Sequence, residues 1–159
     1  MFTLETRAFG NFNKTDVFRI NITGDELESL TNDDLKGYTN LTSLLLENNS
    51  SLKTIDLRGN TSLKYLCLGT CDNLTELRLD ETRIENIDLY DLVSLETIEL
   101  DDRHLLTLHT MLSENITKQF LNIEDTILES FERRIAAADE GERKTLLINA
   151  YETYLKAEA

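Results

Sequence analysis

The aliphatic residues between positions 41 and 100 recur with one short spacing. Successive units place an aliphatic side chain at their first, fourth and sixth positions, with no polar substitution at any of them. Such regular self-similarity is typical of repeat architectures. The six units begin at Leu41, Leu52, Leu63, Leu74, Ile84 and Leu95.

This spacing predicts a solenoid of stacked coils. Side chains alternate along an extended strand, so the fourth and sixth positions of a unit point to the same side. A unit of ten or eleven residues cannot bury its own apolar face, and neighbouring coils must cover one another's leucines. Alternate units then face opposite sides, and two successive units, about 22 residues, make one full coil.

A small polar or thiol side chain follows three residues after the sixth position of the first four units. Such a side chain can turn inward and bond backbone groups of the bend that otherwise stay unpaired. These residues are Asn49, Asn60, Cys71 and Thr82.

The first three units resemble the leucine-rich repeat family, whose pattern is Leu-x-x-Leu-x-Leu-x-x-Asn/Cys. Residues 41–49, 52–60 and 63–71 meet it, whereas Leu92 and Arg103 occupy its last position in the final two units. The short double pattern is most similar to bacterial repeats of the internalin type. The resemblance implies an α/β repeat fold, here a short solenoid with an N-terminal cap and a C-terminal helical hairpin.

The repeats are predicted to cover residues 17–109. Val17, Ile20 and Ile22 fit the same template, and residues 30–44 resemble the longer convex arc of a typical repeat. Residues 1–16 are predicted to shield the first coil, because the terminal coils of a solenoid would otherwise expose leucines.

Residues 110–159 are predicted to form a helical hairpin that caps the last coil. From about Met111 the apolar residues fall three and four apart, which predicts an amphipathic helix from Ser113 to about Ile135. Gly141 breaks this pattern, and a second helix follows. Its apolar residues are Leu146, Leu147, Ala150, Tyr151, Tyr154 and Leu155.

The charge balance favours a protein as the partner. The 159 residues include 16 Lys and Arg against 30 Asp and Glu, a formal charge of −14. This charge repels nucleic acid and anionic membranes and favours a partner with a basic surface. We find neither a membrane-spanning run nor a signal-like segment, so we expect a cytoplasmic protein, or one in the host-cell cytosol if it is translocated. The oligomeric state is left open.

The outward positions of the units form two stripes, one on each side of the coil. Exposed leucine and tyrosine favour the first stripe as the partner-binding face. Its candidate residues are Leu45, Tyr65, Cys67, Asn86, Asp88 and Tyr90. The alternative face is the second stripe, a charged ladder that also reads as a solvated face with paired charges. Its candidates are Asp56, Arg58, Glu76, Arg78 and Glu99. Which stripe is concave stays undecided.

The sequence offers no convincing catalytic or metal-binding constellation. Cys71 occupies a bend position, and Cys67 points to the opposite side, so the two thiols are not expected to form a disulfide. The five-residue separation of His104 and His109 suits neither a helix face nor a strand face, and we assign both to turns. We therefore predict no catalytic residue, no metal and no cofactor, and a protein that is not an enzyme.

The predicted function is protein binding through an acidic sheet face. The internalin-like repeats suggest a bacterial effector that acts on a host protein as one setting. The alternative is an acidic decoy, whose carboxylates mimic nucleic acid and block a basic groove.

Overall fold

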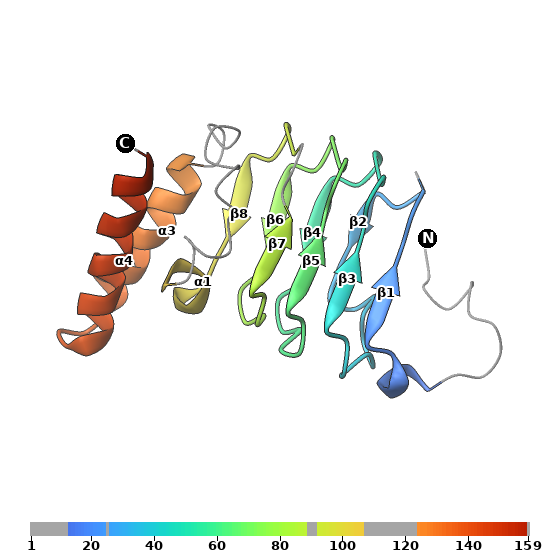
Figure 1. Cartoon of the computed structure of the whole chain (residues 1–159), viewed down its shortest axis with the longest axis horizontal. Coiled ribbons are helices and arrows are strands. Elements are labelled where there is room, and N and C mark those ends of the chain that lie inside the picture. Colours follow the sequence, from blue (N-terminus) through green and yellow to red (C-terminus); the bar gives the residue numbers. More distant parts are fainter. Residues whose placement is uncertain (1–12, 25, 89–91, 107–123, 159) are drawn as a thin grey trace.

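The chain folds as a β-solenoid that is followed by helices (Figure 1). The computed structural model describes residues 13–24, 26–88, 92–106 and 124–158. The predicted cap of residues 1–16 therefore lies largely outside the described residues. Within its described part, Lys14–Asp16 form a single 3-10 turn. No helix in these ranges is long and apolar enough to cross a membrane.

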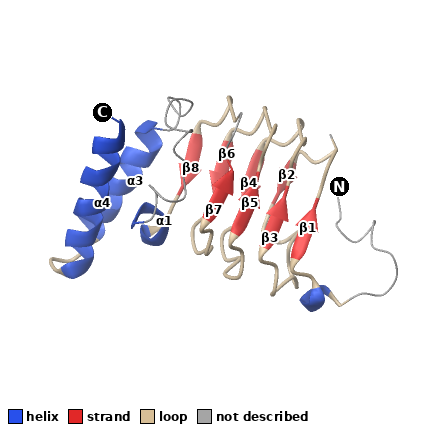
Figure 2. Cartoon of the chain, in the orientation of Figure 1, coloured by secondary structure: helices blue, strands red, loops and turns tan. Residues whose placement is uncertain are grey.

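Both predicted stripes are parallel β-sheets (Figure 2). Sheet A has the strand order β1-β3-β5-β7, and sheet B has the order β2-β4-β6-β8. The strands of sheet A are β1 (Arg19–Asn21), β3 (Ser43–Leu45), β5 (Tyr65–Cys67) and β7 (Asn86–Asp88). The strands of sheet B are β2 (Ser29–Leu30), β4 (Thr54–Asp56), β6 (Glu76–Arg78) and β8 (Thr97–Glu99). Successive units therefore alternate between the two sheets, as predicted.

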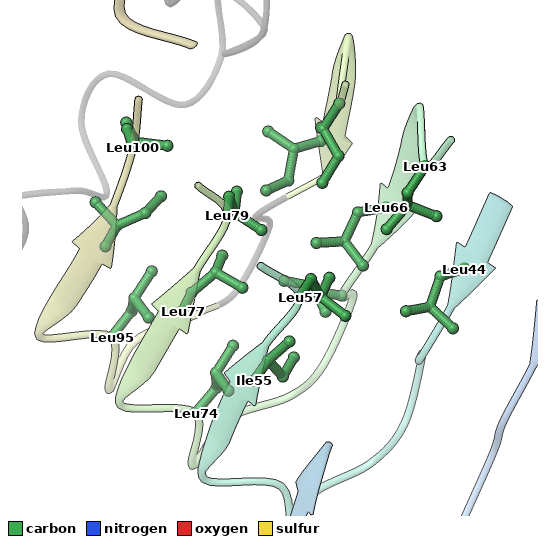
Figure 3. Close-up of a cluster of buried hydrophobic side chains, with 14 of the residues drawn as sticks. Leu44, Ile55, Leu57, Leu63, Leu66, Leu74, Leu77, Leu79, Leu95 and Leu100 are labelled. Atoms are coloured by element: carbon green, nitrogen blue, oxygen red, sulfur yellow. The ribbon is translucent and has the colours of Figure 1, made fainter. Parts of the chain in front are cut away.

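The leucines of successive coils stack in register inside the solenoid (Figure 3). In sheet A, Leu44 pairs with Leu66, and Leu66 pairs with Ile87. Sheet B has the equivalent column of Ile55, Leu77 and Ile98. All six side chains are buried in one continuous core. This confirms the predicted register and the coil of about 22 residues.

The bends are tied by the side chains that the sequence predicted. Asn49 Nδ2 donates to the carbonyl of Leu46 at 2.7 Å, and Asn60 Nδ2 to that of Leu57 at 2.9 Å. The Thr82 hydroxyl donates in the same way to the carbonyl of Leu79, and the Cys71 thiol donates to the carbonyl of Leu46 in the preceding coil. These bonds satisfy acceptors that the turning backbone leaves without a ladder partner.

The residue just before each of these bend residues has a positive φ. The angles are 60° at Asn48, 81° at Gly59, 59° at Thr70 and 64° at Glu81. This left-handed conformation suits glycine or asparagine and is unfavourable for threonine and glutamate. The apolar spacing gives no indication of it.

The predicted arc after β2 contains turns and no helix. Residues 31–41 make successive three-residue backbone hydrogen bonds, beginning with Asp34 N–H to the Thr31 carbonyl at 3.1 Å. The Asp34 carboxylate accepts a bond from Thr31 N–H at 2.8 Å, which fixes the first turn. Leu35 and Tyr38 point into the core and cover it along the arc.

Three helices follow the last strand within the described residues. The short helix α1 (Asp102–Leu106) packs against α4 (Glu142–Glu158), and α3 (Glu124–Ala137) contacts both α4 and β8. Together α3 and α4 confirm the predicted hairpin within the described residues, whereas its predicted start at Ser113 lies outside them. The sequence analysis did not predict α1.

The hairpin continues the core of the solenoid. Phe131 of α3 is fully buried, and its ring centroid lies 5.3 Å from that of Tyr151 in α4. Two of the apolar residues of α4, Leu146 and Leu155, are exposed. Each is the helical neighbour of a buried residue, and one residue turns a helix by about 100°, which directs both side chains away from the core.

Candidate protein-binding faces

The first stripe of predicted residues forms the outer face of sheet A. One row of neighbouring positions runs across its four strands, and we call it the Arg19 row. It consists of Arg19, Ser43, Tyr65 and Asn86, joined by the strand register. The next row is Asn21, Leu45, Cys67 and Asp88. The prediction that these positions come together is thus confirmed for all the described candidates. The side chain of Asp88 and the whole of Tyr90 lie outside the described residues.

Tyr65 is the most exposed apolar candidate on this face. Its side chain is 40% exposed, Asn86 is also exposed, and Leu45 is half-buried. An exposed aromatic ring on a rigid sheet is the kind of side chain that anchors protein interfaces. Sheet A therefore presents an exposed aromatic ring at Tyr65.

The prediction that Cys67 is an exposed contact residue is wrong. Cys67 is 3% exposed, and its thiol donates to the Glu47 carboxylate at 3.1 Å. Its side chain is short, and in the register it lies between Leu45 of β3 and Asp88 of β7. The thiol therefore belongs to the packing of the sheet.

Ser43 also lies on this face, and the sequence analysis gave it no role. It is 8% exposed, and its Oγ is buried without a hydrogen-bond partner. Buried hydroxyls without a partner are uncommon and costly. The strand register shows that Ser43 lies between Arg19 and Tyr65.

The second stripe forms the outer face of sheet B and carries ion pairs. Arg58 binds Asp56 through two bonds, Nε to Oδ1 at 2.9 Å and a second guanidinium nitrogen to Oδ2 at 2.6 Å. Arg78 pairs with a single carboxylate oxygen, Oε1, of Glu76, and its Nε lies 3.7 Å from Glu99. The arginines thus bind mainly the acid two residues earlier on their own strand.

These pairs are partly exposed and contribute little stability. The hydrogen bond from Arg58 holds the pKa of Asp56 below its ordinary value, although partial burial opposes this shift. The side chains of Arg58 and Asp56 are 46% and 29% exposed, so solvent screens most of their attraction. The arrangement agrees with the prediction of a solvated, charge-paired face.

A groove of about 370 Å³ lies where sheet B meets α3. Thr97 and Glu99 of β8 line one side, and Glu129, Ser130 and Arg133 of α3 line the other. Both signs of charge are present. Thr126 on α3 donates to the carbonyl of Glu96 at 3.1 Å, which holds the helix against the end of the sheet.

Cys71 and His104, two residues that could carry chemistry, are both buried. Burial raises the pKa of the Cys71 thiol, which makes it a poor nucleophile. His104 is fully buried, with Nε2 3.0 Å from Thr82 Oγ1. No cluster of three or more potential metal ligands occurs within the described ranges, and His109 lies outside them.

Comparison with known protein families, curated proteins and solved structures found no match. The resemblance to the leucine-rich repeat family therefore rests on the spacing and on the bend residues.

Proposed function

We propose that this chain is a non-enzymatic protein-binding module of the leucine-rich repeat type, which contacts its partner through the outer face of sheet A. The observation that carries the proposal is Tyr65, an exposed aromatic ring held over a fully buried leucine column. Such a sheet loses little conformational entropy on binding, because the core already fixes its side-chain positions.

The net charge selects the class of partner. The formal charge of −14 attracts a protein that has a basic surface. The same attraction raises the rate at which the two proteins associate. The carboxylates of sheet B add to this field at long range, although Arg58 and Arg78 neutralise part of it at contact. Sheet B is the alternative binding face.

The acidic decoy receives less support. A nucleic-acid mimic displays a run of like charges, whereas sheet B intersperses two guanidiniums among its carboxylates. A decoy would also lose nearly all affinity as salt is raised, and an interface centred on Tyr65 and Leu45 would keep much of it.

Quantitative affinity capture from the native setting tests the proposal. The double variant Tyr65→Ala/Leu45→Ala is expected to lose the partner captured by the wild type. The matched control is Asp56→Asn/Arg58→Gln on sheet B, which is expected to retain it. The opposite result would move the interface to sheet B. Retention by both variants, with folding confirmed by circular dichroism, would refute binding through either face.

A further inference from the structure

The Arg19 row places a cation beside an unsatisfied hydroxyl. Arg19 of β1 and Ser43 of β3 are direct neighbours in the register, and Tyr65 of β5 is the next residue across. Adjacent strands lie about 4.8 Å apart, so the three side chains span about 10 Å. A single functional group of a ligand can reach the first two together.

Arg19 differs from four other arginines of the described chain. Arg58, Arg78, Arg134 and Arg143 each lie close to a carboxylate. Arg19 is exposed and makes no ion pair with any residue in the described ranges. In a chain with 30 acidic residues, a guanidinium on a sheet face without a carboxylate is available to a ligand. Its planar fork matches the geometry of a carboxylate.

Ser43 is the second, independent observation. Its Oγ is buried and has no hydrogen-bond partner. This costs free energy in the unbound protein, which a bound ligand would recover by supplying the missing bond. A small shift of the side chains around Ser43 is needed to reach the hydroxyl, and such rotamer changes are common when interfaces form.

We propose that Arg19 and Ser43 together bind a carboxylate from an extended segment of the protein partner, with Tyr65 packing against the same segment. The inference rests on the proposed function, because it uses the same face of sheet A. Charge complementarity to Arg19 selects an acidic side chain. The net negative charge of the chain repels this acidic side chain at a distance, so the basic surface of the partner must provide the long-range attraction. Arg19 and Ser43 then provide selectivity once the two proteins are in contact.

Selection from a display library of random extended peptides tests the inference directly. The proteins to compare are the wild type, Arg19→Glu, Ser43→Ala and the control Arg83→Glu, an exposed arginine in the bend before β7. Peptides selected by the wild type are expected to carry Asp or Glu at one position. Arg19→Glu is expected to weaken their binding by about tenfold or more and to select Lys or Arg instead. Arg83→Glu is expected to behave like the wild type.

Ser43→Ala gives a signature that a purely structural residue would not. Removing the unsatisfied hydroxyl is expected to raise the urea midpoint of the free protein while weakening the selected peptides by about threefold to tenfold. Higher stability with unchanged peptide affinity would remove Ser43 from the site. Absence of any enriched peptide, no preference for acidic residues, or an equal loss with Arg83→Glu would overturn the inference.

The native partner separates this inference from the proposed function. Capture lost with Tyr65→Ala/Leu45→Ala but retained with Arg19→Glu would leave the sheet A interface standing and refute the carboxylate site. Capture retained by both variants would refute both.

Discussion

The guanidinium of Arg143 in α4 lies 2.6 Å from the carboxylate of Asp102 at the start of α1. Arg134 of α3 approaches the other oxygen of the same carboxylate at 3.7 Å and also reaches Asp80 at 3.4 Å. One aspartate at the end of the solenoid therefore contacts both arms of the hairpin. The hairpin is held by this charge network as well as by the burial of Phe131 and Leu147.

Asp102→Asn is expected to lower the free energy of unfolding by about 1–2 kcal/mol. The variant removes the charge of Asp102, which accepts a hydrogen bond from Arg143 and forms a weaker ion pair with Arg134. Solvent screens the bond from Arg143, because that side chain is 55% exposed. Urea denaturation of Asp102→Asn, Arg143→Gln and the double variant would give the coupling between the two residues. A coupling near zero would show that the pair of Asp102 and Arg143 does not stabilise the hairpin.

Asn49→Ala is expected to destabilise the chain by about 2 kcal/mol or more. The Asn49 amide donates to the carbonyls of Ile22 and Leu46, both at 2.7 Å, inside the core. Alanine would leave these buried acceptors unpaired. Asn73→Ala is the matched control, because Asn73 donates one exposed bond to the carbonyl of Ser50. Equal losses in urea denaturation would contradict the role given to the bend residue.

Glu81→Gly is expected to stabilise the protein by about 0.5–1 kcal/mol. Glu81 has a φ of 64°, a conformation that costs a residue with a Cβ about 1 kcal/mol and that glycine adopts freely. The gain is reduced because glycine also makes the unfolded chain more flexible. Thermal unfolding would show a higher midpoint. The same substitution at the neighbouring exposed residue Arg83 is expected to give no gain, and a lower midpoint for Glu81→Gly would exclude relief of strain.

Stability is expected to fall in acid partly through Asp101. Burial by itself would raise the pKa of Asp101, but hydrogen bonds from His104 and from the backbone N–H groups of Glu81 and His104 outweigh it and hold this pKa well below its ordinary value. A carboxyl with a lowered folded-state pKa stabilises the fold above its unfolded pKa of about 4. This contribution is lost as the pH falls from there through the folded-state pKa.

The difference between wild type and Asp101→Asn measures this contribution. Urea midpoints from pH 7 to pH 2 are expected to show a constant gap above about pH 5 that narrows in more acidic solution. A gap that does not change with pH would mean that the charge of Asp101 contributes nothing to folding.

Both cysteines are expected to resist alkylation in the folded protein. Neither Cys67 nor Cys71 is in a disulfide, and both are buried. Burial also raises the pKa of Cys71, so little thiolate reaches solvent at pH 7. Mass spectrometry after iodoacetamide treatment should show slow labelling in buffer and rapid labelling of both thiols in urea. Fast labelling of one thiol in buffer would reopen the question of a reactive cysteine.

The interior of the solenoid could be predicted because its information is local and periodic. Leu44, Leu66 and Ile87 recur at intervals that a parallel coil converts directly into stacked neighbours. Asn49 and Cys71 were predictable for the same reason, since a bend recurs at the same point of each coil.

The outer faces could be predicted only as sets of positions. Cys67 and Tyr65 both lie on sheet A, and yet one is buried and the other exposed. Asp102 pairs with Arg134 and Arg143, which lie more than 30 positions away in the sequence. Residue spacing gives no means of predicting contacts between positions so far apart. The candidate site on sheet A was therefore only partly predictable.

The sequence by itself determined the repeat, the inward residues, the bend residues and the helical hairpin, because each depends on a short period that any coil or helix must satisfy. The tertiary structure alone decided that Ser43 is enclosed without a partner beside Arg19, that a left-handed residue precedes each tied bend, and that Asp102 joins both hairpin helices. These features arise from the sizes and charges of side chains that meet only after the coils have stacked.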